Sequence, residues 1–131
     1  MTVGLDTTVF VRLLIGKPED QFARAEAYLD ELYFRGDQVI VSDLVVAETY
    51  FALQYHYQIS KADALAFIAR AFESGDIKPT GLAVEILRMP ALATAKPGFV
   101  DRLIHAEYLK LAHEVVTFEK AASKLKSVCV L

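Results

Sequence analysis

The 131-residue chain has the length of one domain, so we expect residues 1–131 to fold as a unit, and an apolar content of 54% excludes a disordered protein. A net charge of −3 at pH 7 argues against a broad basic face for duplex nucleic acid. No basic-then-apolar leader precedes Asp6, and no uncharged stretch is long enough to span a membrane, so we expect a cytoplasmic protein.

The first half of the chain predicts two buried strands, each followed by two helices. Apolar runs indicate the strands, and apolar residues at helical spacing indicate the helices. Ser42 and Ser60 are placed to cap two of the helices, and glycines follow three of the predicted helix ends. The predicted elements are a strand over residues 2–5, helices over 7–15 and 19–34, a strand over 38–41, and helices over 42–57 and 60–75.

The second half continues the alternation of strands with helices. In chain order we expect a short strand over residues 76–79, a helix over 80–92 that Pro90 interrupts, a loop over 93–98, an amphipathic helix over 99–112, a strand over 114–117, a short helix over 118–125 and a strand over 127–130. This order predicts an α/β fold with a mainly parallel sheet. In such sheets the ligand site lies beyond the carboxyl ends of the strands.

Four acidic residues are placed toward that edge of the predicted sheet. Asp6 ends the first strand, and Glu119 follows the strand over 114–117 by two residues. Glu48 lies early in the helix after the second strand, and Asp101 lies in the first turn of its helix. Clustered carboxylates repel one another and need cations, and hard oxygen ligands suit Mg²⁺ or Mn²⁺. The pattern therefore predicts a metal site, with a hydroxyl such as that of Thr8 orienting a carboxylate or a water.

Each of these acids also has a structural interpretation. Asp6 can simply cap the next helix, and the helix dipole favours Asp101 and Glu119 where they stand. Glu48 interrupts an apolar stripe that we expect to face the core, since its neighbours three and four residues away are Leu44, Val45, Phe51 and Ala52. Such an acid needs a cation, a buried salt bridge or an edge position that reaches water.

Other kinds of site are not supported by the sequence. The three histidines lack the spacing of a zinc site, Cys129 is the only cysteine, and no glycine-rich phosphate loop or serine elbow is present. Arg12, Lys96 and Arg102 are candidates for phosphate contacts, with solvated surface charge as the alternative for each. A mean hydropathy of +0.31 favours an apolar surface that is reserved for a partner.

The segments around the four acids resemble the PIN-domain nucleases, and among them the VapC-type toxins of toxin–antitoxin pairs. The matching segments are residues 3–9 (VGLDTTV), 45–48 (VVAE), 99–104 (FVDRLI) and 116–122 (VTFEKAA). The resemblance covers nearly the whole chain, and the order and spacing of the four segments make it specific.

The resemblance implies a three-layer fold with a five-stranded parallel sheet in order 3-2-1-4-5, flanked by helices. Asp6, Glu48 and Asp101 would hold Mg²⁺ or Mn²⁺, and the Thr117 hydroxyl would support the site. The implied activity is endonucleolytic cleavage of RNA, often structured RNA, by a metal-activated water. Such toxins are usually homodimers that a cognate antitoxin silences through a peptide in the groove.

The chain departs from the family pattern at two positions. The fourth acid is usually aspartate and here is Glu119, which leaves open whether it binds a second metal directly or through water. Thr8 stands where asparagine or serine is frequent. Two alternatives remain: a catalytically silent PIN-fold protein that binds a partner, and an aspartyl phosphotransferase with Asp6 as nucleophile. The second alternative needs an acid where Thr8 stands.

Overall fold

Short parallel strands alternate with helices along the chain, which confirms the expected α/β class. The computed structural model describes all of residues 1–131. Its strands are β1 (Thr2–Gly4), β2 (Gln38–Val41), β3 (Ile77–Pro79), β4 (Val115–Thr117) and β5 (Val128–Val130). Its helices are α1 (Thr7–Ile15), α2 (Glu19–Phe34), α3 (Asp43–Tyr55), α4 (Lys61–Glu73), α5 (Ala83–Leu87) and α6 (Phe99–Tyr108), with the 3₁₀ helices η1 (Leu92–Thr94) and η2 (Lys120–Lys124).

The strands form two separate parallel sheets instead of one. One sheet has the order β1-β2-β3, with Val3 opposite Val39 and Val39 opposite Ile77, and the other contains β4 and β5 alone. The neighbours within each sheet are those of the order 3-2-1-4-5, but the β1–β4 pair that would join them is absent. One edge of β1 and one edge of β4 therefore have no partner strand.

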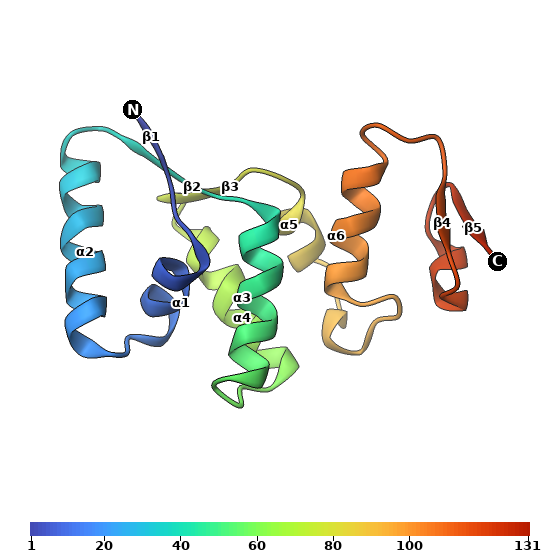
Figure 1. Ribbon diagram of the computed structural model, residues 1–131, viewed down its shortest axis with the longest axis horizontal. Helices are drawn as coiled ribbons and strands as arrows, with labels where there is room; N and C mark the ends of the chain where they lie inside the picture. The colour runs from blue at the N-terminus through green and yellow to red at the C-terminus, as the bar shows by residue number, and fades with distance from the viewer.

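Helix α6 accounts for the separation, because it lies between the two sheets (Figure 1). The outer face of α6 holds the β4–η2–β5 unit: the His105 ring Nε2 is 2.6 Å from the carbonyl oxygen of Lys126. Ile104 and Tyr108 of α6 line a small cavity together with Val115 and Val128 of the two strands. The unit is thus fixed to α6 on the side away from β1.

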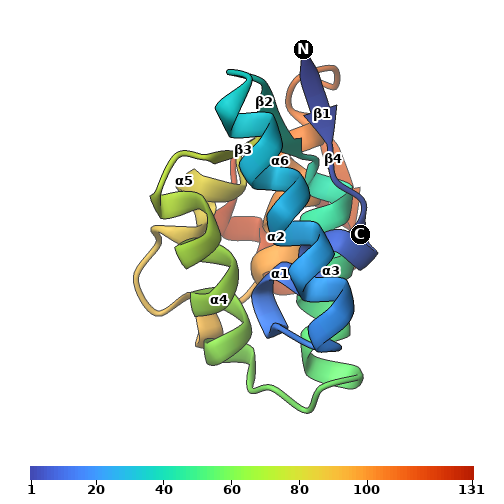
Figure 2. The ribbon, with the colours of Figure 1, turned by 90° about the vertical axis from the view of Figure 1, so that its left-hand side faces the viewer.

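The main core lies where the helices pack against the three-stranded sheet. In the view of Figure 1 this sheet lies above α1, α3 and α4, and Figure 2 shows α2 running alongside α1. Side chains from the sheet, from each of these helices and from α6 are fully buried, among them Phe10, Leu32, Val39, Val41, Leu53, Ile68 and Phe99. None of the helices has both the length and the apolar character needed to cross a membrane.

The predicted helix boundaries are confirmed where a side chain or a glycine fixes them. The hydroxyls of Ser42 and Ser60 accept hydrogen bonds from the backbone N–H groups of Val45 (3.2 Å) and Asp63 (3.1 Å), so they cap α3 and α4. Gly16 ends α1 at a left-handed φ of 75°, which a residue without a side chain adopts without strain.

The C-terminal half contains less helix than the sequence predicted. The helix expected over residues 80–92 is only α5, because Pro90 lacks an N–H and its ring crowds the carbonyl four residues earlier. The loop expected over 93–98 begins inside η1, and the helix expected over 99–112 ends at Tyr108. The short helix expected over 118–125 is the 3₁₀ helix η2.

Candidate active site

Asp6 directly precedes α1 and caps it. Its Oδ1 accepts hydrogen bonds from the Thr8 hydroxyl at 2.7 Å and from the Val9 backbone N–H at 3.1 Å. The Thr8 hydrogen bond is the main reason that the pKa of Asp6 lies below its ordinary value. Both hydrogen bonds use Oδ1, so Oδ2 of this exposed side chain remains available to a ligand. The capping interpretation is confirmed, and it leaves half of the carboxylate free.

Glu48 does not interrupt a core-facing stripe, so that interpretation of its neighbours is wrong. The buried face of α3 is made by Val46, Thr49, Tyr50 and Leu53. Glu48 itself is exposed, Leu44 is 79% exposed and Phe51 is 42% exposed. Leu44, four positions before Glu48, and Phe51, three positions after it, therefore form an apolar surface stripe with Glu48 between them. Because this face of α3 is exposed, Glu48 reaches water, as expected for the alternative in which it occupies an edge position.

Asp101 and Glu119 lie on a common cavity of about 670 Å³, although they are far apart in the chain. The same cavity is lined by Tyr50 and Tyr55 of α3 and by Lys96 of the loop that precedes α6. Glu119 caps η2, since its Oε1 accepts the Ala121 N–H at 3.0 Å. Its own N–H donates to the Thr117 hydroxyl at 2.9 Å, so Thr117 supports Glu119.

The four predicted acids do not form a single cluster. Helix α3, which carries Glu48, packs between α1, which follows Asp6, and α6, which carries Asp101 (Figure 1). No group of three or more His, Cys, Asp or Glu side chains is close enough together to hold a metal ion. The oxygen donors suit Mg²⁺, but their arrangement here does not fit one. Two causes are visible: α6 follows η1 instead of a strand, and β4 is not part of the first sheet.

The three predicted phosphate-contacting residues are in different situations. Arg12 is engaged within the chain, since its Nε donates to Gln21 Oε1 at 2.6 Å and its Nη1 donates to Tyr57 Oη at 3.1 Å. The Nε of Arg102 donates to the Pro97 carbonyl at 2.8 Å, which holds the loop before α6. Only Lys96 is both exposed and without a partner.

Sequence reasoning missed Asp43, which follows β2 as Asp6 follows β1. Its carboxylate faces the turn before α5: the Leu82 N–H donates to it, and a Cβ on Gly81 would collide with it. Oδ1 is buried without a hydrogen-bond partner. Burial raises the pKa of Asp43 above its ordinary value, against smaller lowering effects of the Leu82 N–H and of Lys110. Its place at a strand end was the only signal in the sequence.

We expect Asp43→Asn to raise the melting temperature at pH 7, because it removes a partly buried charge. A raised pKa means that the folded state binds the proton more tightly than the unfolded state. The resulting stabilisation is complete below the unfolded-state pKa and is lost as the pH rises through the folded-state pKa. The gain from asparagine should thus shrink in acid, which thermal unfolding between pH 3 and pH 7 measures.

The matched control for this prediction is Asp63→Asn, which changes an exposed aspartate that is also in the first turn of its helix. This variant should not become more stable at pH 7, since no buried charge is removed. Equal melting temperatures for wild type and Asp43→Asn across the pH range would contradict the prediction.

One of the comparisons with known proteins identifies a family, and this family agrees with the observed α/β class. The family described as PIN domain matches residues 3–127, which is nearly the whole chain. Comparison with curated proteins and comparison with solved structures each give no match.

Proposed function

Because the chain belongs to the PIN-domain family, whose members are generally nucleases, we propose that it is an endoribonuclease that depends on Mg²⁺ or Mn²⁺. The family match carries the proposal. Asp6, Glu48, Asp101 and Glu119 are the side chains to which we assign it, and all four are exposed. Asp6 in addition has a carboxylate oxygen that no hydrogen bond occupies.

The proposal includes a rearrangement that brings these carboxylates together. The outer edges of β1 and β4 are both unpaired, and each strand is parallel to its present neighbour. Pairing β4 with β1 would complete the order 3-2-1-4-5 in one sheet. Since the carboxyl ends of parallel strands lie side by side, Asp6 and Glu119, each two residues beyond its strand, would become neighbours.

We further propose that the chain is the toxin of a toxin–antitoxin pair and acts as a homodimer. Its surface supports binding to other chains, because several large apolar side chains are open to solvent. The most exposed are Phe34 (94%), Leu111 (93%), Phe118 (80%) and Leu44 (79%). A catalytically silent partner-binding protein is the second candidate, and the absence of any group of three metal-binding side chains favours it.

The test is cleavage of a structured RNA with unpaired loops, in Mg²⁺, in Mn²⁺ and in a chelator. We expect cleavage only with a divalent ion, and a loss of roughly a hundred-fold or more in Asp101→Asn, as for other groups that stabilise charge in a reaction. Asp63→Asn, an exposed aspartate on α4, is the matched control and should cleave normally. Full activity of Asp101→Asn would refute the assignment.

The same samples separate the nuclease from the silent protein. A cation that binds only the folded chain raises its stability by about 2.7 kcal/mol at a hundred times its Kd. We expect the nuclease to gain stability in Mg²⁺ and to cleave the RNA, whereas an unchanged melting temperature together with no cleavage would favour the silent protein.

A further inference from the structure

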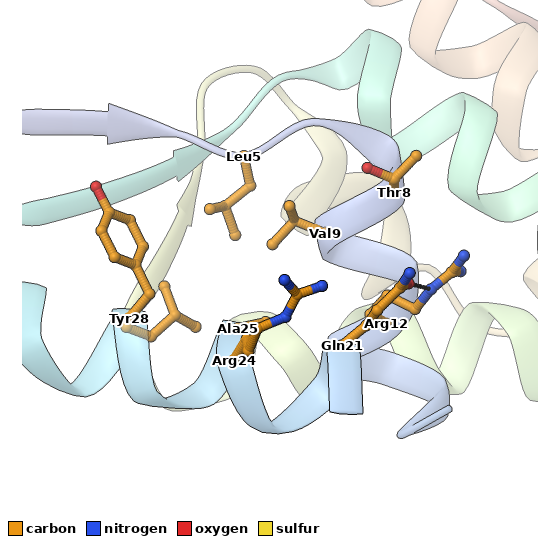
Figure 3. A pocket seen from close by; sticks show the side chains of 9 residues that line it. Leu5, Thr8, Val9, Arg12, Gln21, Arg24, Ala25 and Tyr28 are labelled. Atoms are coloured by element: carbon orange, nitrogen blue, oxygen red, sulfur yellow. Dashed lines mark hydrogen bonds between the residues drawn. The ribbon is translucent and has the colours of Figure 1, made fainter. Parts of the chain in front are cut away.

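A groove of about 540 Å³ runs between α1 and α2, next to the end of β1 (Figure 3). Leu5, Val9 and Leu29 give it an apolar floor. Arg24 and Tyr28 stand one turn apart on the same face of α2 and form one wall. The groove combines an apolar surface with a cationic wall.

Arg24 supplies an uncommitted positive charge. Figure 3 shows its side chain reaching from α2 toward Val9 and Leu5. It has no hydrogen-bond or ion-pair partner, whereas Arg12 at the end of the groove is held by Gln21 and Tyr57. No acidic residue lines the groove, although the chain carries a net charge of −3. The groove is therefore locally complementary to an anion.

Tyr28 adds a flat surface to the same groove. It is 48% exposed, and its ring points up from α2 toward β1 in Figure 3. Arg24 and Tyr28 together match a ligand that has a planar group and an anionic substituent. The anion would lie at the Arg24 guanidinium, and the planar group would stack against the Tyr28 ring. A nucleotide has both features, and the volume is in the range of ligand pockets.

The groove also leads to the candidate active site. Thr8 lines it, and the Thr8 hydroxyl donates to Asp6 Oδ1 at 2.7 Å. We propose that the groove binds one unpaired nucleotide of the RNA next to the bond that is cleaved, with Arg24 on its phosphate and Tyr28 against its base. This subsite rests on the proposed function, because it takes the substrate to be RNA. Arg24 and Tyr28 would then position the strand and favour unpaired over duplex RNA.

The test measures binding apart from cleavage. A fluorescent single-stranded RNA is titrated with Asp101→Asn protein, which is expected not to cut it, from 50 to 200 mM salt. Adding Arg24→Gln should weaken binding about tenfold and flatten the slope of log affinity against log salt by ~0.7, the value for one lost phosphate contact on a single strand. Adding Tyr28→Leu should weaken binding without changing the slope.

Arg88→Gln is the matched control, because Arg88 is an exposed arginine that borders a different cavity. Its affinity and salt slope should equal those of the parent protein. Unchanged melting temperatures would show that Arg24→Gln and Tyr28→Leu are folded, as expected for exposed side chains. Equal affinity and slope in Arg24→Gln and its parent would overturn the subsite, and so would the absence of RNA binding.

The experiment also distinguishes the subsite from the nuclease. If the wild-type chain binds RNA through Arg24 but cuts none, the proposed nuclease fails and the groove stands as an RNA-binding site only. If it cuts RNA and Arg24→Gln binds and cuts equally well, the nuclease stands and the subsite fails. A nucleoside monophosphate is added as competitor: binding of the mononucleotide through Arg24 without RNA binding would assign the groove to a free nucleotide and overturn the RNA proposal.

Discussion

Asp6→Asn is expected to lower RNA cleavage roughly a hundred- to a thousand-fold without unfolding the first helix. Asparagine caps helices as well as aspartate does, so the hydrogen bond from the Val9 N–H to the side chain at position 6 should persist. What asparagine lacks is the negative charge, which the proposed metal site requires. Single-turnover cleavage rates in Mg²⁺ and thermal unfolding of the same sample measure the two effects separately.

Asp6→Ala is the comparison that divides the two roles of this residue. It removes both the cap and the charge, so it should cost about 1 kcal/mol of stability in addition to the activity. Thr8→Val removes the hydroxyl that donates to Asp6 and should lower activity less than Asp6→Asn, because the carboxylate stays. If Asp6→Asn cleaved RNA at the wild-type rate, Asp6 would be a helix cap and nothing more.

Phe99→Ala is expected to destabilise the protein by about 3–5 kcal/mol, the usual cost of deleting a buried aromatic side chain. Phe99 is 1% exposed and meets the Tyr50 ring edge-to-face at 5.3 Å between centroids. This contact joins the first turn of α6 to α3. Asp101 lies two residues after Phe99. We therefore expect Phe99→Ala also to lower the rate of RNA cleavage at temperatures where the variant is still folded.

Urea unfolding of Phe99→Ala is best compared with that of Phe118→Ala, which deletes the same side chain from a position that is 80% exposed. Phe118→Ala should change the free energy of unfolding by no more than about 0.5 kcal/mol. Similar losses in the two variants would mean that Phe99 does not belong to the core.

Local signals in the sequence predicted most of the secondary structure. Ser42, Ser60 and Gly16 fixed helix boundaries because each acts through its own side chain or backbone conformation. Pro90 was recognised as an interruption, but its full effect was underestimated, and only five residues of the expected helix form α5. The separation of β4 from β1 depends on where α6 packs, and no local pattern carries that information.

The candidate site was predicted less well than the fold, because its geometry also depends on how elements distant in the chain pack together. Positions in the sequence pointed to Asp6 and Thr8, whose hydrogen bond is local. The family resemblance pointed to Thr117, whose hydroxyl accepts the Glu119 N–H. The interpretation of Glu48 was wrong because apolar neighbours do not reveal whether a helix face meets the core or solvent. Arg24 was not considered, since its importance comes from the groove that α1 and α2 form together.

The four strand edges without partners, on β1, β3, β4 and β5, have a consequence for the protein in concentrated solution. Open edges of this kind are templates on which further chains can add, and contacts between unlike edges propagate instead of closing. Here the four strands at the open edges are each only three residues long. Such short edges offer few main-chain hydrogen bonds, so brevity itself protects this chain from growing into fibres.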